Sequence, residues 1–443
     1  MNLPDTLVGA REALDSGALT AVQLLDALQQ VMAEREPSVR ALVTATLDLA
    51  REQAAKADAR LAAGDRTPLL GIPVVVKDLI DVAGVPTTAG SRVLAGNVPA
   101  TSSSVWTRLE SAGAVLVGKA NTHEFAYGGT TAPTRNPSDT RRIVGGSSGG
   151  PAAALAAGFC LGALGTDTAG SIRIPANLCG VAGLKPTRGL VPADGVVPLS
   201  PTLDVVGPMA RSVADLDPLL RVIADLPDGP LQPRVPNVVG VLGRPGREEA
   251  SVGEAVAATA VALAGLGARI VEVELAGFTE SVVDDFTVIG FEATKFHRQW
   301  ADRRDLYTPY VRDRLADAAH VTSGQYDAAL AAAGRLAADL DRVLDEVDVL
   351  LLPGVPFPAP PAYDERVLVA GEWEDRDTGL CRNMAFANLT GHPALAVPAG
   401  LDEGLPVGVQ LVGPRGSDLK LIALGALLEP LLSPALPPHL RNG

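Results

Sequence analysis

Short apolar runs, each bounded by glycine or proline, alternate with stretches of helical periodicity along most of this sequence. Such runs are typical of buried strands, and their alternation with helices is typical of an α/β fold. The clearest unit is a strand over 238–243, a helix over 248–264 and a strand over 268–275. We therefore predict one large α/β domain with a mixed, mostly parallel central β-sheet and helices on both of its faces. The other predicted strands lie at 71–78, 114–119, 347–354, 394–400 and 406–414.

The N-terminal part has helical periodicity. Thr20 is a good N-cap, and Val22, Leu25 and Leu28 follow at the spacing of one helix face. Residues 40–62 continue in the same style, so the sequence predicts a second helix there.

Within the single domain (1–443) we distinguish an N-terminal helical segment (1–67), a core (68–225) and a remainder with further sheet strands and pocket helices (226–443). The proline-rich stretch 226–237 is either a hinge or a surface loop, and short connections favour the loop. A last helix is predicted at about 417–431.

Charge and cysteine content exclude several classes of protein. The net charge of −14 argues against direct binding of nucleic acid or of an anionic membrane, because both need clustered Lys and Arg. The three cysteines have no CxxC spacing, so neither a disulfide framework nor a zinc site is indicated. The start of the chain lacks the pattern of a signal peptide, and no apolar run is long enough to span a membrane. We expect a cytoplasmic protein.

Six small residues run together at 145–150 (GGSSGG) and lead into an alanine-rich helix. A flexible linker is a poor interpretation, because apolar residues precede the run and a helix follows it. A phosphate loop would need a following lysine, which is missing. The run also fits a G-x-S-x-G nucleophile turn around Ser147, but that turn needs a preceding strand and a later catalytic histidine.

Histidine offers little support for such a turn. Each of the five histidines is more readily explained as structural or exposed than as catalytic, and His123–Glu124 lacks the second histidine of a zincin. They are His123, His297, His320, His392 and His439.

Lys77 is another candidate base, because it closes the β-branched run at 73–76. A lysine held in an apolar sheet has a lowered pKa and can accept a proton. An ion pair with the adjacent Asp78 or with another acid is the structural alternative, and the local pattern leaves the two open.

A second turn of small residues, GTDTAGS, lies at 165–171. The backbone amides just before Ser171 are well placed to face a developing oxyanion, and the small side chains would let a carbonyl approach closely. A packed strand-to-helix turn is the structural alternative.

With Lys77 and both turns in view, the sequence resembles the amidase signature family. The segment 145–187 is similar to the family's signature along nearly its whole length. Further resembling segments occur in the family's order and extend the similarity from about residue 70 to 430, with 276–345 the least diagnostic part. They are GIPVVVKDLIDVAG, GAVLVGKANTHEFAYG, DVVGPMARSVADL, NLTGHPALAVPAG and GLPVGVQLVGP.

The resemblance implies a Ser–Ser–Lys catalytic triad. Lys77 matches the buried lysine, Ser147 the bridging serine with its unusual cis peptide bond, and Ser171 the nucleophile. The backbone of Thr168, Ala169, Gly170 and Ser171 matches the oxyanion hole. No metal or organic cofactor is implied.

Two further residues are weaker candidates for substrate binding. Gly146 adjoins the bridging serine, and Arg173 follows Ser171 by two residues. Arg173 would grip an acidic substrate, or it would form an internal ion pair, which is the more usual fate of a buried arginine. Two small departures from the family pattern, Pro151 and Ala169, leave the triad intact; proline suits the first turn of a helix.

The family signature does not fix the substrate. A freestanding hydrolase of small carboxamides is our first hypothesis. The alternatives are the A subunit of a tRNA-dependent amidotransferase and an allophanate- or malonamide-type hydrolase; a non-catalytic scaffold is disfavoured by the retained Lys77, Ser147 and Ser171. We expect residues 276–330 to help line the pocket. A small-molecule amide is the expected partner, and a homodimer is a family-level expectation.

Overall fold

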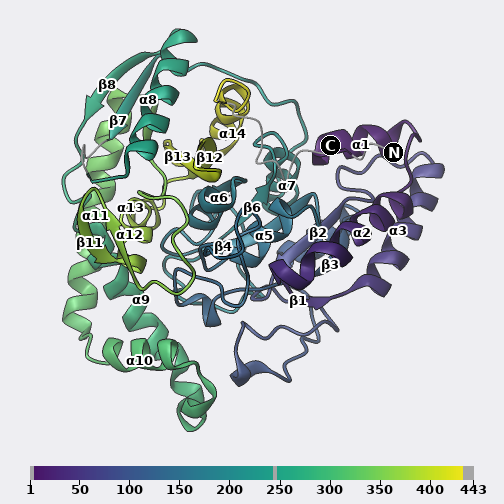
Figure 1. Cartoon of the computed structure of the whole chain (residues 1–443), viewed down its shortest axis with the longest axis horizontal. Helices are drawn as coiled ribbons and strands as arrows, with labels where there is room; N and C mark the ends of the chain where they lie inside the picture. The colour runs from purple at the N-terminus through teal and green to yellow at the C-terminus, as the bar shows by residue number, and fades with distance from the viewer. Residues whose placement is uncertain (1–3, 243–246, 433–443) are drawn as a thin grey trace.

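A sheet of eleven strands forms the centre of the molecule. The computed structural model describes residues 4–242 and 247–432. Figure 1 shows the sheet running from the purple N-terminal strands to the teal β7 and β8. Its strands, in spatial order, are β1 (Leu42–Ala45), β3 (Val115–Ala120), β2 (Pro73–Lys77), β4 (Gly162–Asp167), β6 (Val205–Ala210), β5 (Ala182–Lys185), β12 (Ala394–Asp402), β13 (Leu405–Val412), β9 (Val349–Pro353), β7 (Val238–Leu242) and β8 (Arg269–Val273).

The predicted mixed sheet is confirmed, and its parallel pairs form two blocks. Parallel ladders join β3, β2 and β4 in one block, and β9, β7 and β8 in the other. The strands between the blocks pair antiparallel, and β1 adds an antiparallel edge. Mostly parallel pairing therefore holds within the two blocks but not between them. The middle is antiparallel partly because only two residues join β12 to β13, which parallel neighbours do not permit.

Helices cover both faces of the sheet, as predicted. Two glycines of β4 point to opposite faces: a Cβ on Gly162 would lie 3.0 Å from Leu219 of α7, and one on Gly165 would lie 2.8 Å from Ser148 beside α5. The helices of the described residues are α1 (Leu7–Asp15), α2 (Ala21–Val39), α3 (Leu47–Ala62), α4 (Ser104–Ser111), α5 (Gly149–Ala156), α6 (Arg173–Cys179), α7 (Leu216–Ala224), α8 (Ala250–Gly265), α9 (Ser281–His297), α10 (Pro309–Ala318), α11 (Ser323–Glu346), α12 (Arg376–Cys381), α13 (Ala385–Thr390) and α14 (Asp418–Leu428).

The N-terminal segment contains a strand that the sequence analysis missed. Thr20 caps α2 as predicted, accepting from the Gln23 amide at 3.1 Å. The predicted helix over 40–62 is wrong at its start, where β1 forms and α3 begins only afterwards. The Glu36 carboxylate accepts the amides of Ala41 and Leu42 at 2.9 and 2.8 Å, which turns the chain out of α2 and into the sheet edge.

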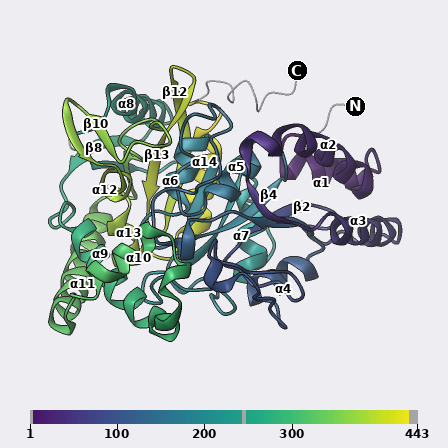
Figure 2. The ribbon, with the colours of Figure 1, turned by 60° about the horizontal axis from the view of Figure 1, so that its bottom comes forward.

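The helices that follow β8 build the second half of the molecule. Figure 2 shows α9, α10 and α11 gathered beside α12 and α13, apart from the purple N-terminal helices. Their apolar side chains form one hydrophobic cluster, while β2, β4 and α5 contribute to another. The turn before α6 contributes to both, since Ala169 belongs to the first of these clusters and Ile172 to the second.

Residues 226–236 form an irregular connection between α7 and β7, in line with the loop interpretation of 226–237. Within 4–242 and 247–432, every helix is too short or too polar to cross a membrane.

Candidate active site

Lys77 lies at the end of β2 and is fully buried. Its Nζ donates to the hydroxyls of Ser147 and Thr166, each at 2.7 Å. Burial lowers the pKa of Lys77 from 10.5 to about 7, against the opposing pull of the Asp204 and Asp167 charges. Near neutral pH, a large fraction of this amine is therefore uncharged and able to accept a proton.

The ion pair of Lys77 with Asp78, which was the structural alternative for Lys77, does not form. Asp78 instead faces Lys119 on β3, whose Nζ lies 3.3 Å from its carboxylate. Successive residues of a strand point to opposite faces of the sheet, so Lys77 and Asp78 diverge although they are neighbours in sequence.

The GGSSGG run forms a tight turn that leads into α5. Thr131 Oγ1 donates to the carbonyls of Gly145 and Ser147, at 3.0 and 3.2 Å. The Gly146–Ser147 peptide bond is cis, as the resemblance implied. Gly146 has room for no side chain, because a Cβ would come within 2.5 Å of the Thr130 carbonyl oxygen.

Ser171 lies in the turn between β4 and α6, next to the serine doublet. The amide of Ser148 donates to the Ser171 carbonyl at 3.0 Å, which ties the two turns together. The Ser171 side chain is 7% exposed and faces the pocket. No residue in the described part of the chain forms a hydrogen bond with its hydroxyl. The structure thus joins Lys77 to Ser147 directly and brings the Ser171 turn beside them.

The four predicted oxyanion-hole amides are not equivalent. The Gly170 amide already donates to Asp167 Oδ1 at 2.9 Å, so it is not free for an oxyanion, which corrects that part of the prediction. The amides of Thr168, Ala169 and Ser171 have no hydrogen-bond acceptor among the described residues. Gly170 itself has φ of +111°, a conformation that favours glycine.

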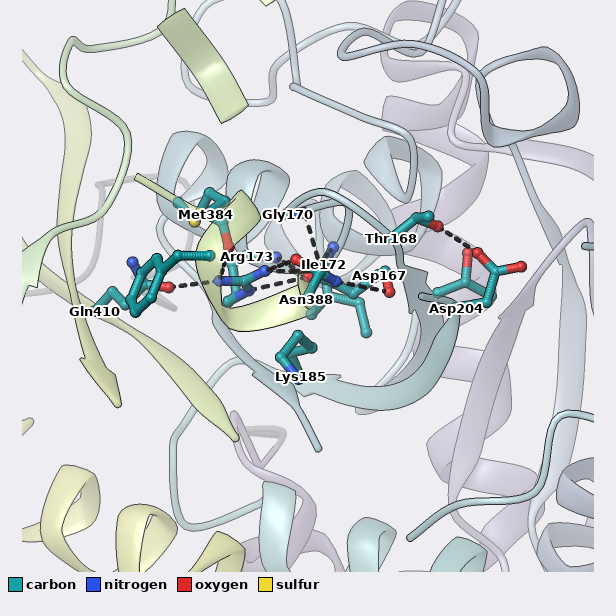
Figure 3. Close-up of polar contacts among 12 residues, drawn as sticks. Asp167, Thr168, Gly170, Ile172, Arg173, Lys185, Asp204, Met384, Asn388 and Gln410 are labelled. Carbon is teal, nitrogen blue, oxygen red and sulfur yellow. Dashed lines mark hydrogen bonds and ion pairs between the residues drawn. The ribbon is translucent and has the colours of Figure 1, made fainter. Parts of the chain in front are cut away.

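Arg173 is part of an internal network rather than of the pocket surface (Figure 3). Its guanidinium pairs with Asp167 at 2.9 Å and donates to Asn388 and Gln410, both at 2.6 Å. Burial alone would raise the pKa of Asp167, but the Arg173 charge and hydrogen bonds hold it below its usual range. This placement matches the ion-pair alternative for Arg173.

A neighbouring contact in the same figure involves Asp204. Its carboxylate accepts from Thr168 Oγ1 at 2.6 Å, and burial raises the pKa of Asp204 to about 6. This contact fixes the side chain of Thr168, the first of the residues predicted to form an oxyanion hole.

A pocket opens in front of Ser171. The sequence analysis missed most of the pocket lining, because the contributing helices α9, α10 and α12 are far from Ser171 in sequence. The expectation that residues 276–330 would help to line the pocket is confirmed by Phe286, Ile289 and Arg314. The lining residues beyond the two catalytic turns are Ala126, Tyr127, Gly128, Gly129, Ile174, Leu199, Phe286, Ile289, Arg314, Asp377 and Cys381.

Three histidines are buried or nearly so, and none lines the pocket. Burial lowers the pKa of His123, His297 and His392, each to about 4. His320 lies outside the pocket as well, and His439 lies outside the described residues. The structural interpretation of the four described histidines is therefore supported.

Comparison with known proteins gives the class of protein to which this site belongs. The model of the Amidase family matches residues 23–422. The chain is 38% identical to the A subunit of the glutamyl-tRNA(Gln) amidotransferase of Roseiflexus sp. (strain RS-1), over 95% of both chains.

Solved structures agree with the family match. An amidase crystal structure matches with a TM-score of 0.91 at 36% identity, covering 97% of this chain and 100% of that chain. The A subunit of the glutamyl-tRNA(Gln) amidotransferase from Thermotoga maritima matches with a TM-score of 0.77 at 29% identity, covering 94% of each chain. Fold and comparisons together define an amidohydrolase. The chain belongs to the amidase signature family, as its resemblance indicated.

Proposed function

We propose that this protein hydrolyses small linear carboxamides to a carboxylate and ammonia or an amine, through an acyl-enzyme on Ser171. The observation that carries the proposal is the fully buried Lys77, with a pKa of about 7, bonded at 2.7 Å to Ser147 in the turn beside Ser171. A base with a pKa near the working pH combines the correct protonation state with useful proton affinity.

In the first half-reaction, neutral Lys77 takes the Ser147 proton while Ser147 takes the proton of Ser171. The Ser171 oxygen forms a bond to the amide carbon, and the C=O electron pair moves onto oxygen. That oxyanion accepts hydrogen bonds from the free amides of Ala169 and Ser171, with Thr168 nearby. The C–N bond then breaks as the proton returns through Ser147 to the leaving nitrogen.

In the second half-reaction, water attacks the ester carbon of acylated Ser171. Its proton passes by the same relay to Lys77 and back to the Ser171 oxygen, which leaves as the hydroxyl. The carboxylate departs, and every group regains its starting protonation. Apart from the substrate and the attacking water, these steps use side chains and amides of this chain.

A second candidate is the A subunit of a glutamyl-tRNA(Gln) amidotransferase, because relatives of that name share 36–38% identity with this chain. Such a protein would use glutamine as its amide and would need partner chains. The names of these relatives favour the second candidate, whereas the higher TM-score with the amidase crystal structure, 0.91 against 0.77, supports the first. The three free, buried cysteines support action in a reducing cytoplasm under either candidate.

The test is ammonia release by the purified chain alone from a panel of simple carboxamides and from glutamine. We expect hydrolysis of the simple amides without any partner. Ser171→Ala should lower kcat/KM by about 10³-fold or more, whereas Ser38→Ala, an exposed serine of α2, should match the wild type. Retained activity in Ser171→Ala would show that another group is the nucleophile. Activity only on glutamine, and only with added partner chains, would favour the second candidate.

A further inference from the structure

The segment 199–204 connects the pocket wall to the start of β6. Leu199 lines the pocket, and Asp204 is the residue before β6. The Asp204 carboxylate accepts from the amides of Leu199 and Ser200, at 2.9 and 3.1 Å. Its other oxygen accepts from Thr168 Oγ1 at 2.6 Å (Figure 3). One carboxylate therefore closes the segment on itself and ties it to the turn that carries the nucleophile.

Glu292 on α9 holds the same segment from the pocket side. Its carboxylate accepts from Ser200 Oγ at 2.6 Å, and from both the amide (3.1 Å) and the hydroxyl of Thr202. It also accepts from the Tyr326 hydroxyl of α11 at 2.7 Å. Ile289, about one turn earlier on α9, lines the pocket. These bonds thus tie the segment to a helix that forms the pocket wall.

Neither carboxylate has a cation in contact. Among the residues that the structure describes, no lysine or arginine forms an ion pair with Asp204 or Glu292. Asp167 differs, because Arg173 pairs with it at 2.9 Å. Hydrogen bonds to a charged oxygen are about twice as strong as neutral ones, so Asp204 and Glu292 hold their hydroxyl and amide donors firmly.

The turn between β4 and α6 is held by a carboxylate on each side. On one side, Asp167 accepts the amides of Gly170 and Ile172 at 2.9 and 3.0 Å. On the other side, Asp204 bonds the Thr168 side chain. The amides of such a turn must face the oxyanion, and a misplacement of about 1 Å can cost about 10²-fold in rate.

We propose that the segment 199–204 sets the position of the nucleophile turn relative to the pocket wall, and that Asp204 and Glu292 are positioning residues for the reaction. This inference rests on the amidase function proposed above. Neither side chain lines the pocket, so both act through other residues. Asp204 acts through Thr168 on the turn, and Glu292 acts on the segment that Asp204 closes.

Asp204 also adds a charge to the site. Burial lowers the pKa of Lys77, and among the opposing charges that of Asp204 is the strongest, followed by that of Asp167. Burial raises the pKa of Asp204 to about 6, so this carboxyl is mostly ionised at pH 7. Burial and the charge of Asp167 raise the pKa of the neighbouring Asp285 well above its usual range, so Asp285 is uncharged there. Removing the Asp204 charge should therefore lower the pKa of Lys77 further.

The first test compares Asp204→Asn with Asp228→Asn, a change at an exposed acid after α7. With a neutral amide such as valeramide, Asp204→Asn should lower kcat about ten- to hundredfold and change KM by less than about threefold, because the turn is displaced. The midpoint of the acid limb of kcat/KM should also move to lower pH, which a loss of stability alone would not cause. Asp228→Asn should match the wild type. A wild-type kcat per folded molecule in Asp204→Asn would overturn the proposal.

Changes at Thr168 separate position from charge. Thr168→Val removes the hydroxyl that bonds Asp204 but leaves the Asp204 charge, so kcat should fall about as far as in Asp204→Asn while the pH midpoint moves far less. Thr168→Ser keeps the hydroxyl and should lose much less activity. Equal kcat in the two Thr168 variants would overturn the role given to this bond.

Glu292→Gln tests the other end of the segment. We expect kcat to fall about tenfold, whereas Glu280→Gln, at an exposed position just before α9, should match the wild type. Because Asp204 and Glu292 hold the same segment, the double variant should lose less activity than the product of the two single losses. Losses that multiply would show independent action and would overturn the shared role of the segment.

Hydrogen exchange separates this inference from the proposed chemistry, because it needs no turnover. Amides in residues 165–172 should exchange at least about threefold faster in Asp204→Asn and in Glu292→Gln than in the two control variants. If Ser171→Ala is inactive but Asp204→Asn keeps wild-type kcat and exchange, only the positioning inference fails. If no amide is hydrolysed yet exchange rises in both variants and not in the controls, the inference stands and the hydrolase proposal fails.

Discussion

Two fully buried lysines on neighbouring strands, Lys77 on β2 and Lys119 on β3, have opposite surroundings. Lys119 lies 3.3 Å from the Asp78 carboxylate and donates to Thr87 Oγ1 at 2.7 Å. Lys77 contacts no carboxylate within residues 4–242 and 247–432, and it bonds two hydroxyls. Burial lowers the pKa of both amines, and in Lys119 the charge of Asp78 acts strongly against that shift. Lys119 is therefore suited to stay charged, and Lys77 is suited to lose its proton.

A third buried lysine shows that a lowered pKa is not enough for catalysis. Burial also lowers the pKa of Lys185 on β5 to about 7, but its Nζ bonds only the Pro186 carbonyl, at 2.9 Å. A carbonyl has no proton to pass on. Lys77 differs because its partner, Ser147, has a hydroxyl in the turn beside Ser171. The comparison therefore assigns function to the pairing of a neutral amine with a serine, and not to burial alone.

The largest expected effect is on the activity of Lys77→Met. Removing the base should lower kcat/KM by about 10³-fold or more. The free energy of unfolding should fall by no more than about 1–2 kcal/mol, because hydrogen bonds to two hydroxyls are lost while the cost of burying the amine is removed. Steady-state kinetics and urea unfolding of the same preparation measure both. A folded Lys77→Met protein with wild-type kcat/KM would remove Lys77 from the mechanism.

Lys119→Met should show the reverse pattern. It leaves the Asp78 carboxylate buried without its cation, which should lower the free energy of unfolding by about 3–5 kcal/mol. The kcat/KM of the folded molecules should stay within about threefold of the wild type, because Lys119 does not line the pocket and substitutions remote from a site have small effects on it. Equal stability of the two Lys→Met variants would break the comparison.

The pH dependence should carry the signature of Lys77. Protonated Lys77 cannot act as a base, so kcat/KM for a neutral amide such as valeramide should fall about tenfold per pH unit below pH 7 and level off above it. A flat profile from pH 5 to 8 would contradict a lysine with a pKa of about 7 as the base.

Stability should follow the same group with a defined sign. The folded pKa of Lys77, about 7, lies below its ordinary value of 10.5, so the unfolded chain binds more protons between these pH values. Lys77 therefore makes the free energy of unfolding rise with pH across that window. Urea unfolding at pH 7, 8 and 9 should show a steeper rise in the wild type than in Lys77→Met.

The smallest expected effect belongs to the second hydroxyl partner of Lys77. Thr166→Val removes one acceptor at 2.7 Å but leaves Ser147 in place. We expect kcat/KM to fall by up to about tenfold, corresponding to one hydrogen bond of about 1 kcal/mol. A loss as large as that of Lys77→Met would mean that Thr166, and not Ser147, carries the proton.

Sequence patterns predicted most of the strands rich in β-branched residues and placed Lys77 at the end of one of them, although they missed β6, whose sequence is VVGPMA. They missed β4 and β5, whose sequences GALGTD and AGLK have low strand propensity and are held by their neighbours in the sheet. Sequence patterns also could not give the partner of Asp78, because its pairing with Lys119 depends on the register of β2 against β3. Arg314 showed no local signal, since its place in the pocket lining arises only when α10 packs beside the pocket.

A direct titration of Lys77 in the intact protein tests the central claim most sharply. The chain has only six lysines, so ¹³Cε labelling gives a small set of NMR signals, and Lys77→Met assigns the one in question. The mechanism predicts that this signal titrates near pH 7 and moves when Ser147 is changed to alanine. A Lys77 signal that stays in its charged position up to pH 9 would contradict the mechanism.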